Sequence, residues 1–225
     1  MRRLALILMM AVMLSAVAQT HYEGSFAVGG TGGVTLSRVN FNPTVQQSLL
    51  PGMTVGAMFR YIEEKNFGLI AELNIAQRGW KEAYDDADYS YSHRFTYLEV
   101  PILTHIFFGN RHVKGFFNLG PELNVMIADG ISSNFDYHNA GLMDYFVQDT
   151  RHVEQLSMKV KNRLDYGICG GAGMEVNLNT KHSLLLEGRF YYGLTDVFSS
   201  HKTDVLSSSN SLTNSVTLGY FYRLK

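Results

Sequence analysis

Residues 67–78 read Phe-Gly-Leu-Ile-Ala-Glu-Leu-Asn-Ile-Ala-Gln-Arg, a stretch in which apolar and polar side chains alternate along most of its length. Leu69, Leu73 and Ile75 lie at odd-numbered positions, and Glu72 and Asn74 lie at even-numbered positions. Each set of alternate positions is called a parity below. Because successive side chains of a strand point to opposite faces of a sheet, this alternation predicts a β-strand with one apolar face and one polar face.

The same period of two recurs along the rest of the chain, whereas helical spacing is almost absent. Eight strands are predicted, at residues 22–37, 53–61, 67–78, 95–107, 113–127, 164–176, 184–192 and 216–224. The connections between them alternate strictly between long ones, of about 15 residues or more, and short ones, of about 5 to 7 residues. This regularity is expected of an antiparallel sheet whose two ends face different surroundings.

Two eight-stranded architectures fit this pattern, a soluble barrel of the lipocalin kind and a transmembrane barrel. The polar parity is rich in Gly, Asn and Thr and has few charges, which suits a narrow filled interior better than a water-facing exterior. The segments also reach the about nine to eleven residues that cross a bilayer at a tilt. Aromatic residues near predicted strand ends suit interfacial girdles: Tyr61, Phe67, Phe107, Phe108, Tyr191 and Tyr192. We therefore expect an all-β fold, an eight-stranded antiparallel up-and-down transmembrane β-barrel with short periplasmic turns and long extracellular loops.

The N-terminus has the composition of an export signal. Arg2 and Arg3 precede an apolar run over 4–14, and small residues follow at 15–18. A permanent membrane anchor is the alternative, but the run is shorter than the about 20 residues that a spanning helix needs. We expect a signal peptide at 1–18, a single barrel domain at 19–225, and a location in the outer membrane of a Gram-negative cell.

Composition and motif spacing exclude several classes of function. The chain has 19 Lys and Arg against 20 Asp and Glu, so it lacks the basic excess of a nucleic-acid-binding protein. One cysteine excludes a disulfide framework and a cysteine-rich zinc site, and the eight histidines lack the spacing of a zinc protease. We expect no metal, cofactor or catalytic site, although Ser92 and His93 near the external rim are candidates for an enzymatic set.

Charged residues on the polar parity form the candidate functional site. Eight are expected to make a lumen charge network: Glu72, Glu99, Glu122, Glu175, Glu187, Arg60, Arg78 and Arg189. Glu23, Asp165, Arg163 and Arg223 share this parity, and His105 is expected to be interior and hydrogen-bonded. Since eight strands enclose room only for side chains, these charges should pair as a structural plug. A proton or ion path is the alternative.

Several blocks of the chain form a recognisable set: Tyr97-Leu98-Glu99-Val100-Pro101, and weaker ones at 67–79, 118–122, 165–175, 185–195 and 216–220. Together they resemble the PorT-like outer-membrane β-barrel proteins of Bacteroidetes, and the block at 97–101 is the most specific match. The resemblance covers nearly the whole mature chain and implies an outer-membrane barrel. Most members of that family have no assigned activity, and the founding member is linked to protein export by the type IX secretion system. One departure is the chain end, Arg223-Leu224-Lys225, where many such barrels finish on an aromatic residue.

These observations predict a non-enzymatic barrel that supports secretion or envelope assembly. The alternative is a surface ligand-binding or adhesion barrel that uses the 128–162 loop, and an outer-membrane enzyme is a third class. The expected partners are outer-membrane lipid and secretion or envelope proteins, with no nucleic acid and a monomeric barrel. A passive diffusion pore is disfavoured because eight strands leave no useful aqueous channel.

Overall fold

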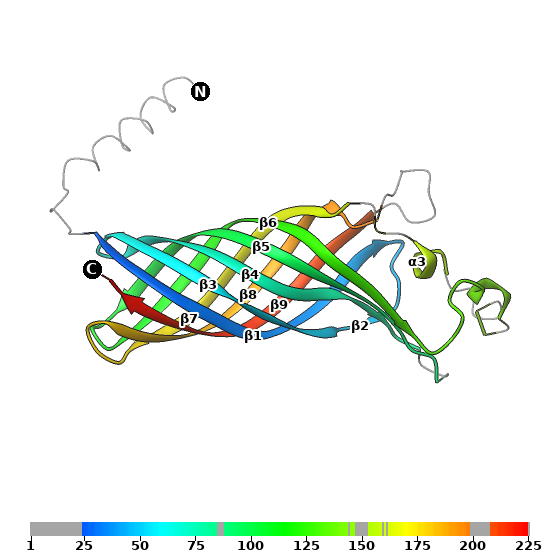
Figure 1. The fold of residues 1–225 in the computed structure, drawn as a ribbon, viewed down its shortest axis with the longest axis horizontal. Helices are drawn as coiled ribbons and strands as arrows, with labels where there is room; N and C mark the ends of the chain where they lie inside the picture. Colours follow the sequence, from blue (N-terminus) through cyan, green and yellow to red (C-terminus); the bar gives the residue numbers. More distant parts are fainter. Residues whose placement is uncertain are drawn as a thin grey trace, which may run out of the picture.

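A computed structural model describes residues 24–84, 88–143, 145–146, 153–158, 160, 162–198 and 208–224. The predicted signal peptide at 1–18 and Glu23 lie outside the described residues. In the part that is described, the chain forms one closed barrel (Figure 1). Its elements are β1 (Ser25–Asn42), β2 (Gln47–Ser48), β3 (Leu50–Glu64), β4 (Phe67–Glu82), β5 (Tyr91–Gly109), β6 (Val113–Ser133), the 3-10 helix η2 (Ala140–Leu142), α3 (Glu154–Ser157), β7 (Leu164–Asn177), β8 (His182–Asp196) and β9 (Ser208–Arg223).

The strand order confirms the predicted topology. The sheet runs β2-β4-β3-β1-β9-β8-β7-β6-β5, and an additional β4–β5 pairing closes the ring of eight long strands. Every pair is antiparallel. Closure leaves the barrel wall without a lateral sheet edge inside the bilayer, where an unpaired backbone could not be solvated.

Long and short connections alternate as predicted, although the strands are longer than expected. The turns at 65–66, 110–112 and 178–181 lie at one end, and the described parts of the connections at 43–49, 83–90, 134–163 and 197–207 lie at the other. In barrels of this kind the short turns are periplasmic and the long loops external. The loop expected at 128–162 starts later, because β6 has 21 residues and continues to Ser133. The barrel therefore extends beyond the length that crosses a bilayer.

The outer wall of the barrel is apolar. Leu119, Leu123, Leu186 and Leu218 are each at least half exposed, with Leu218 at 67%. A belt of such residues around a closed sheet faces acyl chains rather than water. No helix among the described residues is long and apolar enough to span a membrane.

The predicted aromatic positions divide between the wall and the interior. Phe67, Phe108 and Tyr192 are exposed on the wall, as expected of interfacial aromatics. Phe107 and Tyr191 are only 4% and 2% exposed, so their assignment to an outer girdle is wrong. The reason is the strand period: Phe107 precedes Phe108 and Tyr191 precedes Tyr192, so only one ring of each pair can face lipid.

The barrel interior is filled in three layers. The periplasmic apolar layer contains Ala27, Met58, Ile62, Ile70, Leu103, Phe107, Phe116, Cys169, Leu185, Tyr191 and Phe221. The external apolar layer contains Val39, Phe41, Trp80, Tyr91, Phe95, Tyr97, Met126, Ala140, Phe146, Leu156, Val197 and Phe198. A charged layer inside the barrel contains Glu187 together with five residues that line a small polar cavity: Glu72, Arg78, Glu99, Glu122 and Arg189. The sequence predicts a polar interior. The two apolar layers inside the barrel are not predicted from the sequence.

Candidate functional site: the charged layer of the barrel

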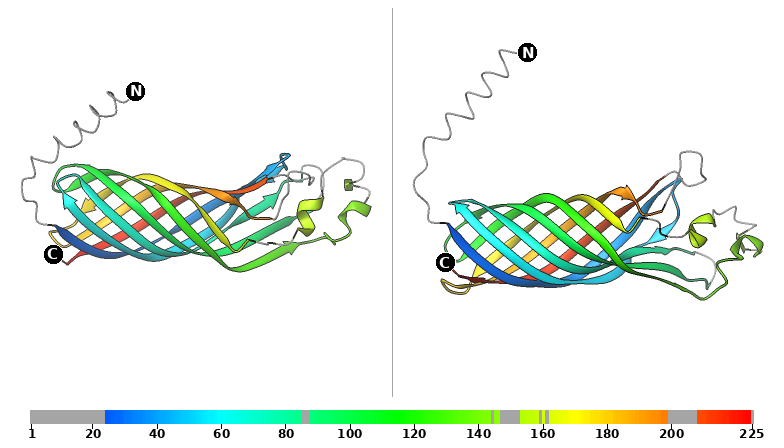
Figure 2. Two further views of the ribbon diagram at one scale, coloured as in Figure 1. Left: turned by 90° about the horizontal axis from the view of Figure 1, so that it is seen from above. Right: turned by 45° about the horizontal axis from the view of Figure 1, so that its top comes forward.

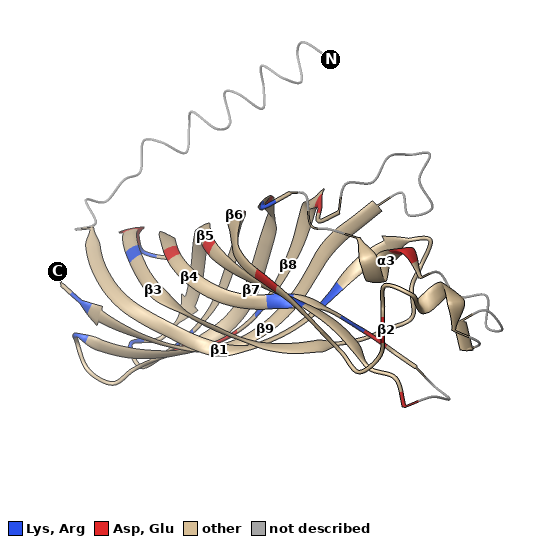
Figure 3. Ribbon diagram, turned by 45° about the vertical axis from the view of Figure 1, so that its right-hand side comes forward, with Lys and Arg blue, Asp and Glu red and all other residues tan. Residues whose placement is uncertain are grey.

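The alternation of the strands brings the predicted network residues into the barrel interior. Each side chain of the eight is at most 11% exposed. Figure 3 shows how few positions along the strands carry a charge at all. The charges that face inward therefore have to compensate one another, because a buried unpaired charge is strongly unfavourable.

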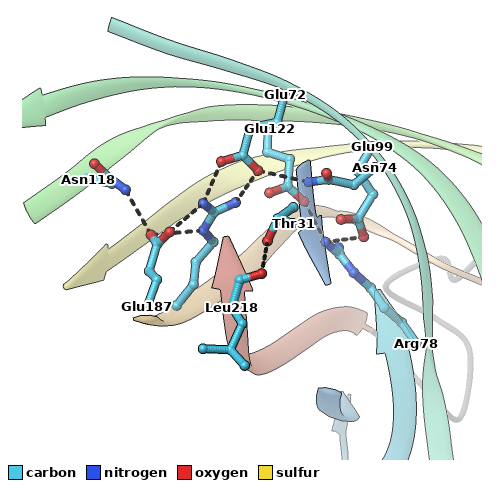
Figure 4. A network of polar contacts seen from close by, with 10 residues as sticks. Thr31, Glu72, Asn74, Arg78, Glu99, Asn118, Glu122, Glu187 and Leu218 are labelled. Carbon is cyan, nitrogen blue, oxygen red and sulfur yellow. Dashed lines mark hydrogen bonds and ion pairs between the residues drawn. The ribbon is translucent and has the colours of Figure 1, made fainter. Parts of the chain in front are cut away.

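Arg189 on β8 is the centre of one half of the charged layer, and its carboxylate partners Glu72 and Glu187 are labelled in Figure 4. Its Nη1 and Nη2 donate to the two carboxylate oxygens of Glu72, each at 2.7 Å. Its Nη2 and Nε donate to Glu187 at 2.9 and 3.2 Å. Asn74 Nδ2 donates to Glu72 and Asn118 Nδ2 to Glu187, both at 2.9 Å. One guanidinium thus holds two carboxylates, each of which also accepts a hydrogen bond from an amide.

Arg78 on β4 is the centre of the other half. Its Nη2 lies 2.5 Å from an oxygen of Glu99 and 2.5 Å from an oxygen of Glu122. Its guanidinium lies over the ring of Tyr191, 4.1 Å from the centroid. Tyr191 in turn donates its hydroxyl to Asp165 Oδ2 at 2.8 Å. The second half of the layer therefore joins charges from β4, β5, β6 and β7.

A separate ion pair lies beside the periplasmic apolar layer. Arg60 donates from Nη1 and Nη2 to the two oxygens of Glu175 at 2.7 and 2.9 Å. The Arg60 guanidinium lies 4.2 Å from the centroid of the Phe221 ring. Both charged side chains are at least 98% buried, because their relative exposures are 2% and 1%. This parallel two-bond geometry is the strongest that an arginine and a carboxylate can adopt.

Several neighbours of the eight residues complete the site. His105 is fully buried and its Nδ1 lies 2.7 Å from Asn118 Oδ1, which confirms its expected interior, hydrogen-bonded position. Asn74 and Asn118 lie on the predicted parity, but the sequence does not show that they bond to the charges. A Cβ atom at Gly171 would lie 2.5 Å from Glu187 Oε1, so glycine there leaves room for the carboxylate.

Other charges on the predicted interior parity lie elsewhere. Asp165 is buried, as expected. Arg163 is exposed and precedes the first residue of β7, so its assignment to the interior is wrong. The strand period cannot orient a side chain that lies outside the strand. Arg223 is half-buried at the last residue of β9.

A small polar cavity of about 30 Å³ lies within the charged layer. Its lining includes Glu72, Asn74, Arg78, Glu99 and Thr213. A space of this size accommodates about one water molecule, which could satisfy polar atoms that the protein leaves unpaired. Two of them, Asn74 Oδ1 and Thr213 Oγ1, have no hydrogen-bond partner in the described part of the chain. The cavity is too small to serve as a channel for solutes.

Three features of the described residues bear on metal and covalent chemistry. No group of three or more His, Cys, Asp or Glu within the described ranges could hold a metal ion. Cys169 is a buried free thiol in the periplasmic apolar layer. Ser92 and His93 are neighbours in β5, so their side chains point to opposite faces of the sheet and do not form a nucleophile–base pair.

Described residues of the long connection at 134–163 pack onto the external end of the barrel. Its residues Ala140, Phe146 and Leu156 are part of the external apolar layer. Tyr91 on β5 donates its hydroxyl to Leu156 O at 2.8 Å. A hydrogen bond from the Asn139 side chain lowers the pKa of Asp136, which stabilises the turn before η2 at neutral pH. Part of this connection therefore closes the mouth of the barrel.

Replacing Tyr91 by Phe should loosen this docking without unfolding the barrel. The change removes one neutral hydrogen bond, worth about 1 kcal/mol, and leaves the Leu156 carbonyl unpaired. We expect cleavage of the 134–163 connection by external protease on intact cells to become about fivefold faster. An unchanged rate in Tyr91→Phe would show that this bond does not hold the connection.

A closed antiparallel barrel with an apolar wall and a filled, charged interior is the structure of a small outer-membrane β-barrel. A family model described as outer membrane protein beta-barrel domain matches residues 17–199. The chain belongs to this family, and the protein is located in the outer membrane.

Two solved structures show the same fold. The outer membrane protein OprG from Pseudomonas aeruginosa is 12% identical with a TM-score of 0.54, over 91% of this chain and 97% of that one. The outer membrane protein AlkL, determined in lipid bilayers, is 9% identical with a TM-score of 0.51, over 92% and 93% of the two chains. A search of curated protein sequences finds no match. At these identities the likeness concerns the fold alone.

Proposed function

We propose that this protein is a closed, non-enzymatic, monomeric barrel that supports protein secretion or envelope assembly through its external surface. The observation that carries this proposal is the filled interior: two apolar layers and a charged layer occupy the lumen, while part of the longest connection covers the mouth. A barrel filled in this way is suited to anchor and present a surface rather than to conduct solutes. The resemblance to PorT-like proteins favours secretion as the process served.

The two ends of the barrel differ in the surface that they can offer to a partner protein. The turns at 65–66, 110–112 and 178–181 are short, whereas the external end carries the connections at 43–49, 83–90, 134–163 and 197–207. The strands also extend past the bilayer at this end. The external end is therefore the larger candidate for contact with exported or envelope proteins.

Gene deletion followed by complementation tests the proposal. Deletion should reduce the amount of exported protein in the medium or weaken the envelope, and the intact gene should restore both. A variant with 134–163 replaced by a short Gly-Ser turn should fail to restore them, while heat-dependent migration in gels shows that its barrel is folded. Normal secretion and a normal envelope after deletion would contradict the proposal.

Surface binding or adhesion is the second candidate, and a group of aromatic rings at the external end favours it. The group consists of Tyr84, Tyr89, Phe135, Tyr145 and Phe146. The ring centroids of Tyr89 and Phe135 lie 5.2 Å apart, and those of Tyr84 and Tyr145 lie 6.2 Å apart. Tyr84, Tyr89, Phe135 and Tyr145 are partly exposed and suited to contact a ligand, whereas Phe146 is buried beneath them. Under this alternative, Tyr89→Ala would reduce binding of cells to their target while secretion stays normal.

A further inference from the structure

Strand β6 extends beyond the strand that pairs with it on one side. Its ladder with β7 ends at Val125 and Leu164, followed by one hydrogen bond from Met126 N to Arg163 O at 2.7 Å. Its ladder with β5 continues to the pair Tyr91 and Ser133. Residues 127–133 are thus paired on the β5 side only, within the described part of the chain. The outer end of β6 reaches past the start of β7 at Leu164 (Figure 2).

The alternation of the strand identifies the backbone groups that face the open side. Asn134 donates its backbone N–H to Ser90 O, which is on the β5 side. In an antiparallel strand the N–H and C=O of one residue point the same way and alternate from residue to residue. The backbone groups of Ser133, Ile131 and Asp129 therefore point away from β5, toward the place that a further strand would occupy.

Backbone groups at other external strand ends are capped by the protein itself. The Gln47 side chain bonds to Val39 N at 3.2 Å and to Val39 O at 2.7 Å. Arg94 Nη1 donates to Pro51 O at 3.0 Å, and Asn162 Nδ2 donates to Asp196 O at 3.0 Å. Among the described residues, no side chain or bridge caps the open edge of 127–133. This edge is therefore unlike the others at the same end of the barrel.

We propose that the open edge of β6 at residues 127–133 binds an extended segment of a partner protein, which adds an antiparallel strand to the sheet. Such strand addition takes its affinity from main-chain hydrogen bonds and its specificity from alternate side chains. This inference rests on the proposed function in one respect, that the partner protein binds at the external surface. It adds the binding site and the mode of contact.

A second copy of this chain does not suit the edge. Strands of such barrels tilt by about 35–45° from the barrel axis, and β6 runs outward in every copy in one membrane. In two copies related by a rotation axis along the membrane normal, both β6 strands would run outward and would cross at an angle. They could therefore not pair as antiparallel strands. Acyl chains do not suit it either, because hydrocarbon cannot satisfy backbone groups.

The side chains along the edge define the chemistry of the partner segment. Ile131 is 37% exposed and offers an apolar contact. The Asp129 side chain is 44% exposed, and its Oδ2 lies 3.5 Å from Nε2 of His93. A matching segment is free of proline, places an apolar residue near Ile131 and places a Lys or Arg near Asp129.

A tethered peptide tests the edge on the full-length protein in lipid nanodiscs. Cys169 is buried, so a Ser132→Cys variant offers one accessible thiol for a disulfide to the probe. The probe is a capped Thr-Val-Lys-Val-Thr-Val-Thr peptide with a flexible Gly-Ser-Cys tail, which the tether holds at millimolar effective concentration. The control probe has the same sequence with alternate amides methylated, which removes its edge donors.

Amide hydrogen exchange gives the readout. The amides of residues 129, 131 and 133 should exchange at least tenfold more slowly with the probe attached than with the methylated control. An added Ile131→Ala change should keep this protection at 129 and 133, whereas Ile131→Pro, which removes the central edge donor, should abolish it. Equal exchange with the two probes would overturn the proposal, as would protection that survives Ile131→Pro. Because the assay uses purified protein, its result is independent of whether deletion affects secretion.

Discussion

Replacing Arg189 by Met should lower the free energy of unfolding by about 3–5 kcal/mol, because two buried carboxylates lose the guanidinium that they share. In the folded barrel this guanidinium contacts Glu72 through two bonds of 2.7 Å and Glu187 through a bond of 2.9 Å. Urea unfolding of the protein in lipid vesicles can be followed by the fluorescence of Trp80, the one tryptophan of the chain.

Two variants control this experiment. Arg111→Met changes an exposed arginine of a periplasmic turn and should shift the free energy by less than about 0.5 kcal/mol. The triple variant Arg189→Met, Glu72→Gln, Glu187→Gln removes the buried carboxylates together with the guanidinium and should recover most of the loss. If Arg189→Met unfolded at the same urea concentration as the native protein, the charged layer would not contribute to stability.

The Arg60–Glu175 pair should show the second large effect. Arg60→Met and Glu175→Leu should each cost about 3–5 kcal/mol, because each leaves one buried charge without its partner. The double variant should cost far less than the two losses added together, since both charges leave the interior. The two bonds of 2.7 and 2.9 Å and the exposures of 2% and 1% are the basis of this expectation.

A complete double-mutant cycle provides the measurement for this pair. A coupling free energy of about 2 kcal/mol or more between the two positions would support a buried ion pair. Additive losses would show that each residue stabilises the barrel separately, through packing on Phe221 for example, and would contradict the assignment.

Much of the fold could be predicted from the period of two alone. Segments such as 67–78 alternate well enough to orient each side chain, and the alternation of connection lengths specifies an antiparallel barrel. The ends of the strands could not be predicted, because pairing continues where the polarity pattern stops. The register between β5 and β6 shifts at Thr96 and Tyr97 of β5, opposite Met126 of β6. The alternation of apolar and polar side chains is therefore lost beyond Met126, although β6 continues to Ser133.

The members of the charged network could be predicted, but their partners could not. Arg60 and Glu175 are 115 residues apart in sequence and meet across the interior of the barrel. Which charges meet depends on the register of six strands and on barrel closure, neither of which a single segment encodes. The apolar layers were missed for a related reason: near strand ends both parities are apolar, as at Phe107 and Phe108, so polarity no longer distinguishes lumen from lipid.

Solute permeation most directly tests the central claim that the barrel is closed. Purified protein reconstituted into liposomes should give no swelling with arabinose above protein-free liposomes, and planar bilayers should show no discrete conductance steps. A general diffusion porin in the same lipid provides the positive control. The layers that fill the lumen predict the absence of permeation, and steady swelling proportional to the amount of protein would contradict the account.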